Sequence, residues 1–336
     1  MGHRLRRALD PFLQRATGRR TRAFVLSGGG SLGAVQVGML RALVEAGIKP
    51  DLVIGCSVGA INGAGFAADP TLRGVARMER IWRRMAAGNP EVMPGGFMPL
   101  AVQLARRGQS LHDPRHLAQL LTDELPASDF AQLKVPFQCV ATDLKAAAEH
   151  WFTTGPLVPA LMASASLPAV FPACELEGRT LIDGGVLNEI HTHRAVELGA
   201  TELWVLHVGH LADKERPVQR PFDSALRAYW TARRFRFQDD LRRIPGHCAV
   251  HVVPAGATPR LRFDDFTHAS ELIEAAYDAA SAYLIRLDQG HDPGPDPSPV
   301  VEPVPAELAY DADDIDPDAT AEPATAFTAE QDQAGA

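Results

Sequence analysis

Residues 22–40, RAFVLSGGGSLGAVQVGML, place three consecutive glycines directly after a short apolar run and directly before a helix-like one. This order predicts a buried strand, a glycine turn and a helix, because glycine lets the backbone turn tightly and come close to a ligand. Such a turn has two common uses: it cradles the phosphates of a dinucleotide, or it presents backbone N–H groups to the oxyanion of a hydrolase. The rest of the sequence has to decide between them.

The glycine turn satisfies the G-x-G-x-x-G pattern of a dinucleotide-binding fold through Gly28, Gly30 and Gly33. That fold also needs an Asp or Glu roughly 20 residues later, at the end of the second strand, to hold a ribose hydroxyl. The second predicted strand, PDLVIGCS at residues 50–57, carries its acid, Asp51, at the beginning instead. The pattern therefore argues against an NAD(P)-dependent oxidoreductase.

The second predicted strand ends in GCSVG, a G-x-S-x-G pattern in which Gly55 and Gly59 flank Ser57. Small neighbours let the chain turn sharply from strand into helix, which exposes the serine hydroxyl at the carboxyl edge of the sheet. The start of the following helix favours negative charge through its free amides and its dipole. If the two strands are adjacent and parallel, the N–H groups of the glycine turn and of Val58 can bind the oxyanion of a tetrahedral intermediate.

A serine nucleophile needs a proton acceptor, and the sequence offers two kinds. Some of the histidines that follow Ser57 are candidates by the residue order of an α/β-hydrolase, namely His191, His193, His207, His210, His251 and His268. That fold normally reaches its nucleophile after several strands, whereas Ser57 follows only the second. The other acceptor is Asp183, which follows the strand-like run TLI and precedes Gly184 and Gly185. Taken alone, this DGG could equally be an ordinary turn.

The ordered set GGGSLG, GCSVG and DGG resembles the patatin-like phospholipase family. The segments PFQCVATDL, FTTG, ASASLPAVFP and ELGA are also similar to that family, so the resemblance covers about residues 22–210. It implies a dyad with Ser57 as nucleophile and Asp183 as base, without a histidine, a metal or a cofactor. It also implies an oxyanion hole lined by Gly28, Gly29 and Gly30, which Val58 would complete, and supporting roles for Gly33, Gly55, Gly59, Gly184 and Gly185.

The chain departs from the family pattern at two places. The glycine turn of the family often carries Arg or Lys before its last glycine, where this sequence has Leu32, so charge assistance from that position is absent. The segment after the base often contains a proline shortly after Asn188, where Ile190 and His191 stand here. Neither departure touches the dyad, but both leave substrate choice and rate open.

Alternating strand and helix patterns with short glycine turns predict an α/β fold with a mostly parallel sheet. The family resemblance implies three layers, α/β/α. We expect a basic N-terminal segment at residues 1–21, a lipid acyl hydrolase domain at 22–287 and an acidic Pro/Ala-rich tail at 288–336. The tail holds thirteen Asp or Glu and no Lys or Arg, and its composition predicts disorder.

Two arginine-rich segments, residues 1–21 and 225–244, bear on membrane contact. Each is compatible with a helix packed on the domain and with a helix that contacts an anionic lipid surface. No stretch approaches the roughly 18 apolar residues of a spanning helix, and no secretory signal is evident. Four cysteines without zinc-like spacing predict reduced thiols. We expect a cytoplasmic protein, free or peripheral at the inner membrane face, with no nucleic-acid partner.

The expected function is that of a serine lipid acyl hydrolase, a phospholipase or esterase that cleaves carboxylic ester bonds of lipids through an acyl-enzyme. Two alternatives stay open: acyl transfer to another acceptor at the same site, and a non-catalytic lipid- or acyl-binding protein with the same fold. Intact Ser57, Asp183 and glycines favour catalysis. The head group and the acyl-chain length of the substrate do not follow from the sequence.

Overall fold

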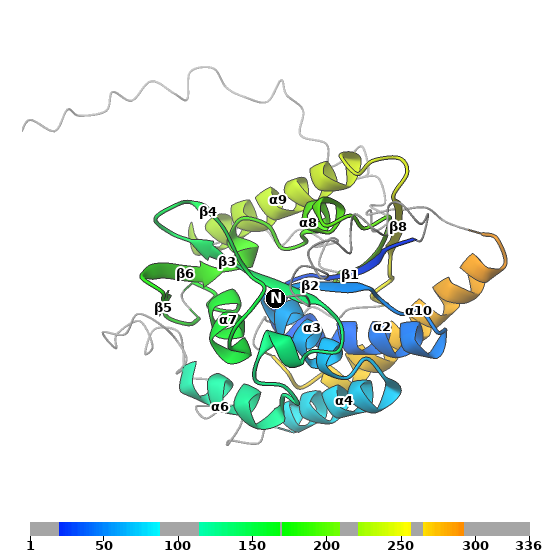
Figure 1. The fold of residues 1–336 in the computed structure, drawn as a ribbon, viewed down its shortest axis with the longest axis horizontal. Helices are drawn as coiled ribbons and strands as arrows, with labels where there is room; N and C mark the ends of the chain where they lie inside the picture. The colour runs from blue at the N-terminus through cyan, green and yellow to red at the C-terminus, as the bar shows by residue number, and fades with distance from the viewer. Residues whose placement is uncertain (1–19, 88–113, 169, 209–220, 257–264, 292–336) are drawn as a thin grey trace, which may run out of the picture. The chain divides into compact units, whose positions relative to one another are not determined.

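A computed structural model describes residues 20–87, 114–168, 170–208, 221–256 and 265–291, with only the backbone at 221–230 and 234 (Figure 1). All of these residues belong to one unit, Met1–Pro299. The predicted basic segment lies outside the described residues except for Arg20 and Thr21, and the predicted acidic tail lies outside them beyond His291. The limits of the predicted domain therefore stay a prediction.

An eight-stranded mixed sheet runs through the described residues in the order β5-β6-β3-β2-β1-β7-β8, with β4 paired to β3. Neighbours from β3 to β8 in this order are parallel. The strands β4 and β6 run antiparallel to β3, and β5 runs antiparallel to β6. The predicted, mostly parallel sheet is confirmed, and the antiparallel part is an addition. The strands are β1 (Arg22–Leu26), β2 (Leu52–Cys56), β3 (Phe137–Asp143), β4 (Ala148–Phe152), β5 (Cys174–Leu176), β6 (Arg179–Asp183), β7 (Glu202–Leu206) and β8 (Ala249–Val252).

The central strand β1 is apolar on both faces. Phe24 and Leu26 belong to the larger hydrophobic core, whereas Ala23 and Val25 belong to a second core on the opposite side of the sheet. Successive side chains of a strand point to opposite faces. An uninterrupted apolar strand therefore needs helices on both sides, as in other sheets buried on two faces.

Helices cover both faces of the sheet, which confirms the predicted three-layer α/β/α architecture (Figure 1). One layer consists of α8 (Thr192–Glu197) and α9 (Pro221–Arg242). The other consists of α2 (Ala34–Glu45), α3 (Val58–Ala68), α4 (Leu72–Ala86), α6 (Pro114–Glu124), α7 (Leu157–Ser164) and α10 (Ala269–Asp288). Three short 3₁₀ helices, η1 (Gly30–Gly33), η2 (Phe130–Gln132) and η3 (Gly184–Val186), join these elements.

The second arginine-rich segment forms most of α9. The helix buries Arg233, Phe237 and Asp240, which recur at helical spacing, and exposes Phe235 and Arg236. This burial agrees with a helix packed on the domain, and the buried face carries two charged residues, Arg233 and Asp240. Within the described ranges, every helix is too short or too polar to cross a membrane. Contact with a lipid surface stays a prediction.

Candidate active site

Ser57 lies at the sharp turn between β2 and α3. Its backbone has φ 55° and ψ −126°, a conformation that non-glycine residues rarely adopt. A Cβ on Gly55 would lie 2.3 Å from the carbonyl oxygen of Gly59, and a Cβ on Gly59 would lie 2.4 Å from that of Ser27. The Ser57 N–H donates a hydrogen bond to Ser164 Oγ at 3.0 Å. A strained serine between obligatory glycines is the geometry of a nucleophile elbow.

The glycine turn lies beside this elbow because β1 and β2 are adjacent and parallel, with Leu26 opposite Gly55. A Cβ on Gly28 would lie 3.3 Å from the Cβ of Ser57. Gly29 and Gly30 adopt positive φ angles of 153° and 58°, which favour glycine. The predicted neighbourhood of the two motifs is therefore confirmed.

The backbone N–H groups of the turn and the elbow differ in their surroundings. The Gly28 N–H donates to the carbonyl oxygen of Glu189 at 3.3 Å, so this amide is already engaged and Gly28 contributes through its close approach to Ser57. Gly29, Gly30 and Val58 line the same pocket as Ser57. Their N–H groups are the candidates for an oxyanion hole.

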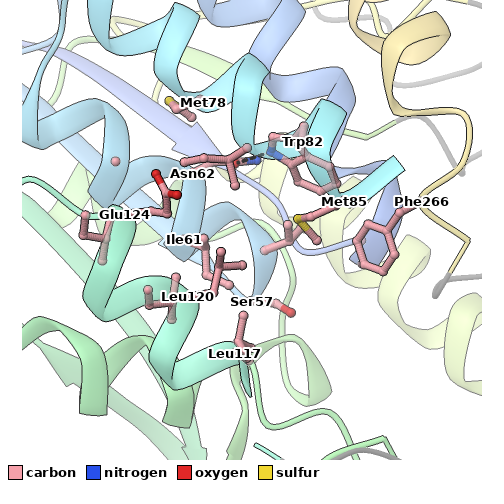
Figure 2. A pocket seen from close by; sticks show the side chains of 18 of the residues that line it. Ser57, Ile61, Asn62, Met78, Trp82, Met85, Leu117, Leu120, Glu124 and Phe266 are labelled. Carbon is pink, nitrogen blue, oxygen red and sulfur yellow. Dashed lines mark hydrogen bonds between the residues drawn. The ribbon is translucent and has the colours of Figure 1, made fainter. Parts of the chain in front are cut away.

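A buried network of side chains holds the glycine turn. Gln36 Nε2 donates to the carbonyl oxygen of Ser27 at 2.8 Å. Asn62 Nδ2 donates to the carbonyl oxygen of Gly33 and to Gln36 Oε1, both at 2.9 Å. Trp82 Nε1 donates to Asn62 Oδ1 at 3.1 Å, as Figure 2 shows. Asn62 thus links α2, α3 and α4 behind the turn.

We expect Asn62→Leu to lower the free energy of unfolding by about 2 to 4 kcal/mol, because it leaves buried partners on Gly33, Gln36 and Trp82 without hydrogen bonds. Urea denaturation followed by circular dichroism measures this change. The matched control is Gln119→Leu, which removes an amide bonded to Asp123 at the surface and should change stability by less than ~0.5 kcal/mol. Equal midpoints for the two variants would contradict a structural role for the network.

Asp183 ends β6, which runs antiparallel to β3 with Ala141 opposite Asp183. Asp183 is 2% exposed; its carboxylate accepts a hydrogen bond from the Gly185 N–H at 2.7 Å and lies close enough to the Ser57 hydroxyl for that hydroxyl to lower the pKa of the carboxyl. Burial raises the pKa of Asp183, while the Ser57 hydroxyl, the positive charge of Arg233 and the Gly185 bond lower it. The structure therefore brings the two predicted residues, Ser57 and Asp183, together in one pocket.

The candidate histidines have other partners. Among the five that the structure describes, His191 and His193 contact Glu149 at 3.4 and 3.3 Å, His207 contacts Glu189 at 3.4 Å, His251 stacks on Trp204, and His268 contacts Glu271 at 3.0 Å. His210 lies outside the described residues. Within those residues, no three His, Cys, Asp or Glu side chains converge as ligands for a metal ion. Asp183, by contrast, lines the same pocket as Ser57 and interacts with its hydroxyl.

Arg233 is a residue of the site that motif reasoning missed. It belongs to α9, yet its buried side chain ion-pairs with Glu189 and lines the pocket together with Ser57 and Asp183. The sequence feature that could have indicated this residue is the helical spacing of Arg233, Phe237 and Asp240, which places the Arg233 side chain on the apolar face of the helix. Because the sequence has six other arginines in and near this helix, the position of Arg233 on the buried face did not stand out.

An apolar pocket with a volume of about 220 Å³ begins at Ser57 and extends between α3, α4 and α6. In Figure 2, Ile61, Leu117 and Leu120 lie next to Ser57, whereas Met78 and Glu124 lie farther away. No motif in the sequence pointed to α4 or α6 as part of the site. The lining also includes Gly65, Trp82, Met85, Leu121, Leu125, Leu167, Val170, Phe171 and Phe266.

The patatin-like phospholipase family matches residues 24–196, just over half of the chain. The chain therefore belongs to the patatin-like phospholipase family, as the ordered motifs GGGSLG, GCSVG and DGG indicated. The description of this family names phospholipases.

Two curated relatives illustrate the extent of the similarity. Neuropathy target esterase sws of Drosophila melanogaster is 30% identical over 193 residues, which are 57% of this chain and 13% of that protein. Patatin-like phospholipase domain-containing protein 7 of Rattus norvegicus is 28% identical over 210 residues, which are 62% of this chain and 15% of that protein. The chain thus matches only a small part of these much longer relatives.

Solved structures with a similar course of the chain include VipD from Legionella pneumophila, with a TM-score of 0.41 and 14% identity, covering 81% of this chain and 67% of that one. Another is human GIVD cytosolic phospholipase A2 in complex with methyl gamma-linolenyl fluorophosphonate, with a TM-score of 0.41 and 10% identity, covering 81% of this chain and 59% of that one. These likenesses carry no argument about function.

Proposed function

We propose that this protein is a serine lipid acyl hydrolase, a phospholipase or esterase that cleaves carboxylic ester bonds of lipids through a Ser57–Asp183 dyad and an acyl-enzyme. The observation that carries the proposal is that Ser57, on a strained elbow, and the buried Asp183 line the same apolar pocket. A nucleophile, a base and an acyl-binding space thus meet at one point. Family membership supports the same class of reaction.

In the proposed reaction Asp183 accepts the Ser57 proton while Ser57 Oγ attacks the ester carbonyl carbon. The oxyanion of the tetrahedral intermediate is stabilised by the N–H groups of Gly29, Gly30 and Val58. The intermediate expels the alcohol or lysolipid, which takes the proton from Asp183. Water, deprotonated by the same carboxylate, then attacks the acyl carbonyl carbon. The bond to Ser57 Oγ breaks, Ser57 takes the proton back from Asp183, and the fatty acid is released. The raised pKa of Asp183 makes its carboxylate a stronger base for both steps.

The proposed substrate places its acyl chain in the apolar pocket along α3. The pocket follows this helix from Ser57 to Gly65, a length of about 12 Å at 1.5 Å per residue. Burial of apolar chain surface favours binding by about 25 cal/mol per Å². A lipid acyl chain fits this lining better than a polar acyl group does.

The test is to react the purified full chain with a long-chain alkyl fluorophosphonate and to measure its intact mass. We expect a phosphonyl adduct on Ser57 in the wild type and none in Ser57→Ala. In parallel, fatty acid release is measured from p-nitrophenyl esters and from phosphatidylcholine and phosphatidylglycerol vesicles. A wild type without adduct and without hydrolysis of any ester would favour a lipid- or acyl-binding protein instead.

Gly65 offers a test of where the acyl chain lies. A Cβ at this position would lie 3.7 Å from Met78 Cγ and 4.0 Å from Leu125 Cδ2, so a longer side chain has room only by filling the pocket. We expect Gly65→Met to lower kcat/KM for p-nitrophenyl dodecanoate at least ~10-fold, because a long acyl chain no longer fits the narrowed hydrophobic pocket. The kcat/KM for p-nitrophenyl butyrate should stay unchanged.

The matched control for this substitution is Gly246→Met, because a Cβ at Gly246 meets nothing within 4 Å. Replacing a glycine inside a helix by methionine also raises helix propensity by up to ~1 kcal/mol, so the Gly65 variant is expected to fold. An unchanged ratio of dodecanoate to butyrate hydrolysis would place the acyl chain elsewhere.

A further inference from the structure

Arg233 brings a buried positive charge to the proposed site from a helix that follows Ser57 by more than 160 residues. Its side chain is 7% exposed and ion-pairs with Oε2 of Glu189. A Cβ on Gly28 would lie 3.4 Å from Arg233 Nη2, and a Cβ on Gly185 would lie 2.8 Å from the same atom. The guanidinium therefore packs against both the glycine turn and the DGG turn, where glycines leave it room.

Glu189 joins this cation to the glycine turn. Its side chain pairs with Arg233, and its carbonyl oxygen accepts the Gly28 N–H at 3.3 Å. On its other side, Glu189 Oε1 lies 3.4 Å from His207 Nε2. A buried guanidinium is stable only where anions and hydrogen bonds compensate its lost hydration. Glu189 provides such compensation and orients the side chain toward Asp183.

The charged and titratable groups around Asp183 come from several elements. Arg233 faces it from α9, Glu189 from the segment after η3, and Cys56 Sγ from β2 at 4.0 Å, with His207 behind Glu189. Arg233 lowers the pKa of Asp183, whereas Glu189 raises it. The same opposed influences act on the buried thiol of Cys56. The position before the last glycine of the turn holds Leu32 and supplies no cation.

We propose that Arg233 is a positioning residue of the reaction, which keeps the Asp183 carboxylate ionised for its role as base and supplies the positive charge that the glycine turn itself lacks. The inference rests on the proposed function, since it assigns a role in the same site. It identifies a residue outside the three motifs and predicts that α9 belongs to the catalytic unit.

The test compares Arg233→Met, which removes the charge, with Arg233→Lys, which keeps it. For a soluble short-chain ester we expect Arg233→Met to lower kcat at pH 7 about 10²-fold, the usual effect of removing one electrostatic group from such a site, with little change in KM. The acidic limb of the pH–activity profile of Arg233→Met, where activity falls as the pH is lowered, should move to higher pH. Activity requires ionised Asp183, and the lost cation had lowered the pKa of that carboxyl. Arg233→Lys should retain the wild-type limb.

Glu189→Gln should shift the pH–activity profile in the opposite direction. Its lost negative charge had raised the pKa of Asp183, so the acidic limb should move to lower pH. This variant also decides the question if Arg233→Met does not fold, as judged by circular dichroism: no movement, or movement to higher pH, would overturn the proposal. Equal losses of kcat in Arg233→Met and Arg233→Lys, without a shift of the acidic limb of the pH–activity profile, would also overturn the proposal. Failure of the proposed function is distinct, because the wild type itself would then neither hydrolyse esters nor bind the fluorophosphonate.

Discussion

Replacing Ser57 by alanine is expected to lower kcat/KM for an ester by about 10⁵- to 10⁶-fold, as loss of the nucleophile does in other serine hydrolases. The variant retains the pocket and the backbone N–H groups, so substrate binding should survive while chemistry fails. The alanine Cβ is already accommodated, since Ser57 has a Cβ in the same strained backbone. The variant should therefore fold like the wild type.

Steady-state hydrolysis of p-nitrophenyl butyrate measures this loss, with circular dichroism to compare the folds. The matched control is Ser281→Ala in α10, because Ser281 takes no part in the proposed site. The control should retain wild-type activity. More than about 1% residual activity in Ser57→Ala would assign the nucleophile to another residue, because removal of a nucleophile leaves far less.

Replacing Asp183 by asparagine is expected to lower kcat about 10³- to 10⁴-fold, the range found when a general base or its equivalent is removed. Asparagine has nearly the same size and can still accept the Gly185 N–H, but it cannot take the Ser57 proton. The wild type should lose activity as the pH falls through the pKa of Asp183. Burial raises that pKa, so the acidic limb should lie above the range of an exposed aspartate.

The pH profile separates this role from a structural one, because the acidic limb should disappear in Asp183→Asn. Asp143→Asn is the matched control: Asp143 lies on the neighbouring strand β3 and pairs with Arg179 at 2.7 Å, away from Ser57. Among correctly folded molecules, Asp143→Asn should keep the activity of the wild type and the acidic limb of its pH–activity profile. Activity that survives in Asp183→Asn but not in Ser57→Ala would instead assign the base to a histidine.

The local elements of the site follow closely from their residues. The helix expected after GCSVG forms α3 at Val58–Ala68, and the strand expected at residues 50–57 forms β2 at Leu52–Cys56. These segments combine apolar runs with glycine turns, so local preference and burial favour the same structure. The pairing of Asp183 with Ser57 needed the family resemblance, because DGG alone could be any turn.

The rest of the site depends on contacts between residues far apart in the chain. The helical pattern around Leu117 and Leu120 gave no sign that these side chains approach Ser57, since spacing within a helix identifies its buried face but not what that face covers. Arg233 was hidden for the same reason. A guanidinium among many arginines has no local mark that distinguishes a buried one, and only the packing of α9 against the sheet determines its partner, Glu189.

The sequence by itself determined the two strands that lead into the site, the glycine turn, the serine elbow and, through the ordered motifs, the family, because each is encoded in neighbouring residues. The tertiary structure decided which backbone amide is engaged, which pocket adjoins Ser57 and which cation faces Asp183. The physical reason is that strand, turn and helix arise from short-range sterics and hydrogen bonds. The electrostatic field and the cavity of an active site arise from side chains that only folding brings within a few ångströms of each other.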